Sequence, residues 1–122
     1  MRCVQIDVEE GSLGTFDVLE TWPERLKGLL GDVGGSRQVL IADCGSIHTV
    51  GMRYPIDVAF VNRDMRVCLA RRRLPPGRVL GSREASFVLE RRSNPGIWPV
   101  EGDYALVEGE WSLGGQYGRE TN

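Results

Sequence analysis

Short stretches in which apolar and polar residues alternate recur along the chain, with glycine, proline or asparagine between them. A period of two places the apolar side chains on one face, which is the pattern of a half-buried β-strand. Sixteen glycines in 122 residues are about twice the usual share and supply the turns between strands. The predicted strands are residues 3–9, 15–19, 38–42, 56–61, 66–72, 86–90 and 103–107.

One segment has a helical pattern instead. Thr21 and Glu24 have the spacing of a capping box, and Pro23 lies in the first turn. Gly31 is the expected end of this helix. Four apolar residues have the spacing of one helix face, which predicts that this face packs into the core: Trp22, Leu26, Leu29 and Leu30. The predicted fold class is therefore α+β, mostly antiparallel β, with a small barrel-like sheet and one short capped helix.

The length predicts a single domain over residues 1–122, with 112–122 as a frayed polar tail.

No run of 18 apolar residues occurs, so no insertion into a membrane is expected. The N-terminus lacks the pattern of a secretory signal, which favours a cytoplasmic location. The three cysteines, an odd number without a Cys-x-x-Cys pair, are therefore expected to be reduced: Cys3, Cys44 and Cys68.

Charge is distributed unevenly along the chain. Residues 37–92 carry eleven basic and five acidic side chains, whereas both flanking segments are acidic. Either the segments neutralise each other when their strands pair, or the middle segment builds a surface that faces an anion. The arginines at 71–73 lack the interleaved aromatic residues that grip single strands, so no binding of nucleic acid is predicted.

The densest group of polar side chains lies in residues 46–61, which include the only histidine. Ser46, His48 and Asp57 are the residue types of a nucleophile, a base and an orienting acid. No Gly-x-Ser-x-Gly turn exposes the serine, so the spacing does not enforce a catalytic triad. His48 has two open interpretations, a loop-fixing hydrogen bond or contact with a ligand.

A ligand-binding cleft is the favoured interpretation of these side chains. Asp57 alternates with the apolar residues of its strand and therefore points to the other face, where a partly buried carboxylate needs hydrogen-bond donors. Glu90 ends an apolar strand and has the same need. We expect the ligand-binding residues to surround one cleft on one side of the molecule: His48, Arg53, Asp57 and Glu90.

The sequence predicts neither a metal site nor a cofactor. Cys44 and His48 are four residues apart, but no second group of cysteine or histidine completes a tetrahedral set.

Five motifs in order resemble the signature of the bacterial and archaeal family known as domain of unknown function 192. They are Arg-Leu-Lys-Gly-Leu-Leu at 25–30, Ser-Ile-His-Thr at 46–49, Met-Arg-Tyr-Pro-Ile-Asp at 52–57, Val-Leu-Glu at 88–90 and Gly-Asp at 102–103.

This resemblance covers about residues 18–108 and implies a compact, mainly β fold with one helix. It implies no reaction, because none is assigned to the family. The family usually has a glycine soon after Val-Leu-Glu, whereas here residues 91–95 precede Gly96. The rim near Glu90 is therefore expected to differ in shape.

The leading functional prediction is a binding module, a monomer or weak dimer, that holds a polar or anionic small ligand or a segment of a partner protein. The cleft would lie between the 43–57 segment and the strand at 86–90. One alternative is a small hydrolase-type enzyme that uses His48 with Asp57 or Glu90. Another is a structural or assembly protein linked to a cell-envelope or secretion system. The sequence favours binding over catalysis.

Overall fold

The computed structural model describes residues 2–113, and within them a seven-stranded sheet has the strand order β6-β5-β8-β3-β2-β1-β9. β4 and β7 form a separate two-stranded sheet. The elements are β1 (Cys3–Val8), β2 (Gly11–Leu19), α1 (Trp22–Lys27), β3 (Gln38–Ala42), β4 (Ser46–His48), β5 (Ile56–Val61), β6 (Val67–Leu74), β7 (Val79–Gly81), β8 (Phe87–Arg92) and β9 (Leu106–Gly109).

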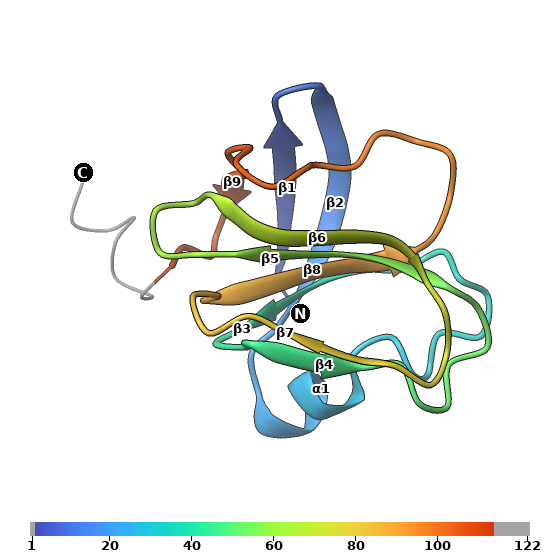
Figure 1. Ribbon diagram of the computed structural model, residues 1–122. Helices are drawn as coiled ribbons and strands as arrows, with labels where there is room; N and C mark the ends of the chain where they lie inside the picture. Colours follow the sequence, from blue (N-terminus) through green and yellow to red (C-terminus); the bar gives the residue numbers. More distant parts are fainter. Residues whose placement is uncertain (1, 114–122) are drawn as a thin grey trace.

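The large sheet curls strongly, so that β1 and β2 stand across the direction of β5, β6 and β8 (Figure 1). β2 pairs with β3 in parallel, and the other strand pairs of this sheet are antiparallel. The two-stranded sheet and α1 lie below β3 and β8 in this view. The predicted fold class, α+β with a mostly antiparallel, barrel-like sheet and one short capped helix, is confirmed.

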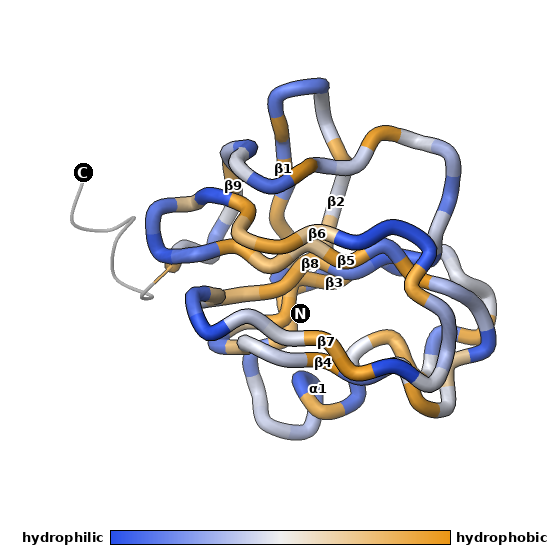
Figure 2. The backbone as a smooth tube through the Cα atoms, in the orientation of Figure 1, coloured by the Kyte–Doolittle hydropathy of each residue, from blue (hydrophilic) through white to orange (hydrophobic). Residues whose placement is uncertain are grey.

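Apolar side chains are buried on both faces of the central strands. Along β3, β5 and β8 successive residues alternate between two apolar clusters, one inside the curl with Phe16 and Phe87, the other beneath it with Leu29 and Ile47. Figure 2 shows these strands as the hydrophobic middle of the molecule, with hydrophilic turns around them. Because both faces are covered, every residue of β5 is buried, including one carboxylate.

The helix begins as predicted and ends earlier. Thr21 accepts a hydrogen bond from the Glu24 N–H, and the Glu24 carboxylate accepts one from the Thr21 N–H, which completes the capping box. The end at Gly31 is wrong, because Gly28 caps the helix with a φ of 52°, a left-handed value that glycine adopts without strain.

The early end of α1 changes which apolar residues are buried. Only Leu29, which follows the cap, enters the core, with 2% of its surface exposed. The prediction of a packed helix face is wrong for the other three residues: Trp22 is 68%, Leu26 is 62% and Leu30 is 44% exposed. A helix of six residues is too short to keep four apolar positions on one buried face.

The remaining differences concern short elements. The 43–54 segment contains β4, which pairs with β7, and neither strand is among the predicted ones. The last strand lies at Leu106–Gly109, three residues beyond the predicted start at 103. Most of the predicted frayed tail lies outside the described residues. The part of the chain that the structure describes contains no helix with the length and apolarity that crossing a bilayer requires.

Arginines of the basic middle segment pair with carboxylates of both acidic flanks. Arg37 lies 2.8 Å from Asp17 of β2, and Arg71 lies 3.8 Å from Glu101. These pairs support the interpretation in which the segments neutralise each other.

Candidate functional site

An open cleft of about 530 Å³ lies between α1 and the two-stranded sheet, below the central strands. Its walls come from residues 22–30 on one side and from residues 43–48 with Val79 on the other. Ile41, Ile56 and Glu90, from β3, β5 and β8, form its floor. The volume is in the range of sites that hold small organic ligands.

The walls are mainly apolar and remain open to solvent. The three α1-segment residues that fail to enter the core line this cleft, together with Met52 and with Val79, which is 76% exposed. Exposed apolar side chains gathered around a groove indicate an interaction site more often than scattered ones do.

Thr49 fixes the wall formed by β4 and β7. Its side chain is fully buried; the hydroxyl donates a hydrogen bond to the Pro75 carbonyl oxygen at 2.7 Å and accepts one from the Arg78 N–H at 2.8 Å. The Thr49 N–H donates to the Arg78 carbonyl oxygen at 2.8 Å. Two of these bonds tie the end of β4 to Arg78, which precedes β7, and the third holds Pro75, so together they fix the position of the wall.

Glu90 is the buried carboxyl group of the floor. It is 4% exposed, and its position on β8 is opposite Val39 of β3 and Val58 of β5. Burial raises the pKa of Glu90 from 4.5 to about 7, because the charged form loses its hydration. A carboxyl group that titrates near neutrality inside a cleft is a candidate functional group.

Arg25 and Cys44 also line the cleft. Nη1 of Arg25 donates to the carbonyl oxygens of Ala42 and Asp43, at 3.2 and 2.9 Å, whereas its Nε is buried without an acceptor. Burial raises the pKa of the Cys44 thiol, and the nearby Glu90 adds to this rise. A thiol with a raised pKa is a weak nucleophile, so Cys44 lacks the activation that a catalytic cysteine needs.

Asp57 lies on the opposite face of the sheet from Glu90. Val58 pairs with Glu90 and Asp57 pairs with Arg91, and side chains of neighbouring residues in a strand point to opposite faces. The expectation that Asp57 and Glu90 share one cleft is therefore corrected. The alternation along β5 gave the direction of Asp57 relative to Ile56, but the face on which Glu90 lies depends on the register between two distant strands.

A set of donors remote in sequence satisfies the fully buried Asp57. Its carboxylate accepts hydrogen bonds from Nε of Arg91 at 3.0 Å, from the Ser93 hydroxyl at 2.9 Å and from the Arg73 N–H at 3.1 Å. The guanidinium of Arg91 also lies 4.5 Å from the centre of the Trp98 ring. Asp57 therefore has a structural role, in which it joins β5, β6 and the segment after β8.

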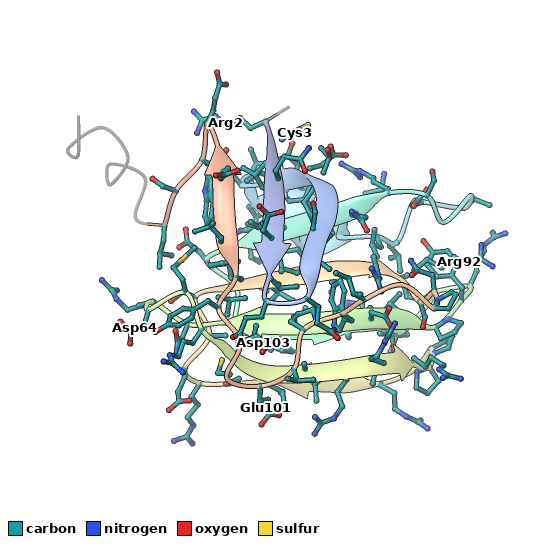
Figure 3. All side chains as sticks on the ribbon, turned by 90° about the horizontal axis from the view of Figure 1, so that it is seen from above. Arg2, Cys3, Asp64, Arg92, Glu101 and Asp103 are labelled. Carbon is teal, nitrogen blue, oxygen red and sulfur yellow. The ribbon has the colours of Figure 1, made fainter. Side chains whose placement is uncertain are left out.

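This network lies at the end of β8, near Arg92. Figure 3 shows Arg92 on the opposite side of the view from Asp64, which marks the turn between β5 and β6. A hollow beside the network is lined by Pro55, Arg72, Arg73, Ser93, Asn94 and Pro95.

The other predicted site residues are divided between the cleft and the solvent. Ser46 and His48 are exposed on β4 and line the cleft with Glu90. Arg53 is exposed and is not among the lining residues. The Ser46–His48–Asp57 triad of the enzyme alternative is not formed, because the Asp57 carboxylate is bonded within the network on the other face.

Sequence reasoning missed the apolar part of the site. The spacing places Trp22, Leu26 and Leu30 in the core, and Val79 lies in a strand too short to show a period. Gly28 within the helical pattern is a signal for an earlier helix end, because glycine is the commonest residue where helices stop. Among residues 2–113, no group of three or more His, Cys, Asp and Glu side chains has the arrangement of a metal site.

Comparisons with known proteins identify the fold. A protein of unknown function from Novosphingobium aromaticivorans has a similar structure, with a TM-score of 0.67 and 22% sequence identity over 85% of this chain and 83% of its own. A "putative transcription regulator" from Sinorhizobium meliloti has a TM-score of 0.66 and 21% identity over 88% of this chain and 92% of its own. No family model and no curated protein sequence matches the chain.

Proposed function

We propose that the protein is a binding module whose cleft holds the apolar body of a small amphipathic molecule. The observation that carries this proposal is the exposure of Trp22, Leu26 and Val79 around an open cleft with a carboxyl group in its floor. Apolar walls with a small number of placed polar groups are typical of small-molecule sites. The apolar walls favour such a ligand over the polar or anionic small ligand that the sequence predicts.

The test is a titration with small amphipathic molecules, followed by protein NMR. Binding should shift the methyl signals of Leu26, Leu30 and Val79, because these side chains line the cleft. Leu26→Ser and Val79→Ser should each weaken binding without unfolding the protein, because both residues are exposed. Leu106→Ser is the matched control. Leu106 is exposed as well, at 58%, but it lies on β9 at the far edge of the sheet.

Two results would count against this function. Equal loss of binding in all three variants would show that the molecules attach to apolar surface in general. Binding of apolar peptides, but of no small molecule, would favour the assembly role instead.

We also propose membership of the domain of unknown function 192 family. Four of its five motifs supply residues to the cleft, among them Arg25, His48, Met52 and Glu90. We further propose that the protein is cytoplasmic and that it is a monomer or a weak dimer.

A second candidate function is acid–base catalysis, and one observation favours it. Glu90 has a pKa of about 7 and lies in the same cleft as His48, so it can donate and accept a proton at neutral pH. Turnover of simple esters that is lost in Glu90→Gln and kept in Glu84→Gln would favour catalysis. Glu84 is the control because it is exposed and outside the cleft.

A further inference from the structure

The Glu90 carboxyl group lacks a partner of opposite charge within the described residues. No Lys, Arg or His side chain of residues 2–113 lies within 4.0 Å of it, whereas Asp57, the other buried carboxylate of the central strands, has such a partner in Arg91. No hydrogen-bond donor contributes to its pKa, which burial alone raises. An unpaired carboxylate in an apolar setting is costly, so this group gains from a donor that enters the cleft.

The groups around Glu90 leave that position open. Val39 and Val58 flank it on the neighbouring strands, and Gly28 of the α1 end lies so close that a Cβ there would be 3.5 Å from Oε1. Cys44 and Tyr54 each interact electrostatically with Glu90, and both carry raised pKa values because burial disfavours their charged forms. Both groups are therefore neutral at pH 7, and neither compensates the Glu90 charge.

Arg25 and the remaining lining charges do not supply the missing cation. Arg25 is held away by its two bonds to the carbonyl oxygens of Ala42 and Asp43. Asp43 itself carries a negative charge at the rim, and Lys27 and His48 lie on the walls. The floor therefore combines an unpaired carboxyl group with apolar surroundings.

We propose that the ligand is an amphipathic primary amine, whose ammonium group pairs with Glu90 while its apolar body lies against Leu26, Ile47 and Met52. This inference rests on the proposed function and adds the chemical class of the ligand. A bound apolar body excludes water from the pair, which strengthens the attraction between the ammonium and the carboxylate.

An amphipathic carboxylate fits the same cleft less well. Nη1 of Arg25 is already bonded to two carbonyl oxygens and its Nε is buried, so this guanidinium has no exposed, free pair of donors for a bidentate contact with a carboxylate. A carboxylate next to Glu90 also places two like charges together unless Glu90 keeps its proton. The amine meets neither obstacle.

Proton linkage makes the proposal measurable. An alkylamine is charged throughout the pH range 6–8, whereas Glu90, with a pKa of about 7, loses its proton within that range. Because the amine pairs only with the ionised carboxylate, its affinity should be about tenfold higher at pH 8 than at pH 6. An alcohol with the same apolar body should show no such dependence.

The experiment compares 4-phenylbutylamine, 4-phenylbutanol and 4-phenylbutyrate in NMR titrations of the full chain at pH 6 and pH 8. The amine should bind more tightly than the alcohol at pH 8 and should lose about tenfold in affinity at pH 6. In Glu90→Gln the amine should fall to the affinity of the alcohol at both pH values. Glu84→Gln, an exposed carboxylate removed, should behave as the unaltered protein does.

Each other outcome has a definite meaning. Equal binding of the amine and the alcohol to the unaltered protein would overturn this inference and leave the proposed function standing. Preferred binding of the carboxylate, stronger at pH 6, would also overturn it and would assign a donor role to protonated Glu90. Failure of all three molecules to bind would contradict the inference and the proposed function together. The pH comparison on the unaltered protein needs no variant, so it decides even where Glu90→Gln does not fold.

Discussion

Asp57 and Glu90 lie on directly paired strands, one residue out of step, and their carboxyl groups point to opposite faces of the same sheet. The Asp57 carboxylate accepts hydrogen bonds from Arg91 and Ser93. The pKa of Glu90, in contrast, is raised by burial alone. The sequence predicts the same role for both carboxyl groups, in one ligand-binding cleft, but in the structure their roles differ. Asp57 stabilises the fold, and Glu90 remains available to a ligand.

Replacing Asp57 by asparagine should destabilise the protein without affecting the cleft. The change leaves the buried guanidinium of Arg91 without its countercharge, which typically costs about 3–5 kcal/mol of unfolding free energy. Urea denaturation measures this cost, and Asp64→Asn in the exposed β5–β6 turn is the matched control. A loss below about 1 kcal/mol would show that the network does not hold β5, β6 and the segment after β8 together.

Replacing Glu90 by glutamine should stabilise the protein more at pH 8 than at pH 5. Burial places the folded-state pKa at about 7, above the ordinary value of 4.5, so the folded state keeps a proton that the unfolded state releases. Stability from this group is fully present below pH 4.5 and declines as the pH rises to about 7. The uncharged amide removes this decline.

The difference in unfolding free energy between Glu90→Gln and the unaltered protein should grow by about 2–3 kcal/mol between pH 5 and pH 8. Urea denaturation at both pH values measures it, and Glu84→Gln should show no such growth. A constant difference would mean that the Glu90 pKa is not raised in the folded state.

Two leucines near the end of α1 should respond in opposite ways to truncation. Leu29→Ala removes a buried core side chain and should cost about 2–5 kcal/mol of unfolding free energy. Leu26→Ala changes an exposed side chain and should cost less than about 0.5 kcal/mol, while it weakens ligand binding in the cleft. Thermal unfolding and NMR titration of both variants test the pair. A large stability loss in Leu26→Ala would restore the packed helix face that the spacing predicted.

The alternating segments made most of the sheet predictable. The predicted strands 38–42 and 56–61 coincide with β3 and β5, because each is a short apolar run of strand length with turn residues at its ends. β4 and β7 are three residues long and pair with each other, so no local period marks them. The spacing of apolar residues extended the predicted helix beyond Gly28, whose positive φ ends it.

The candidate site was predictable only in part, because its faces depend on pairing between distant segments. The pattern around Asp57 shows a carboxylate in need of donors, and His48 and Arg53 are the candidate donors nearest in sequence. The donors in the structure come from residues 73, 91 and 93, which β6 and β8 bring alongside β5. The face of Glu90 follows from its pairing with Val58, a register that no single segment contains.

The cysteines provide a chemical test of the cleft. Cys3, Cys44 and Cys68 are unbridged, so titration of the denatured, non-reduced protein should find three thiols per chain. Cys44 lines the cleft and Cys3 is exposed outside it. Bound 4-phenylbutylamine should therefore slow the alkylation of Cys44 by iodoacetamide and leave the rate at Cys3 unchanged, as measured by peptide mass spectrometry. Equal slowing at both cysteines would place the amine elsewhere, and a single titratable thiol would reveal an intramolecular bridge.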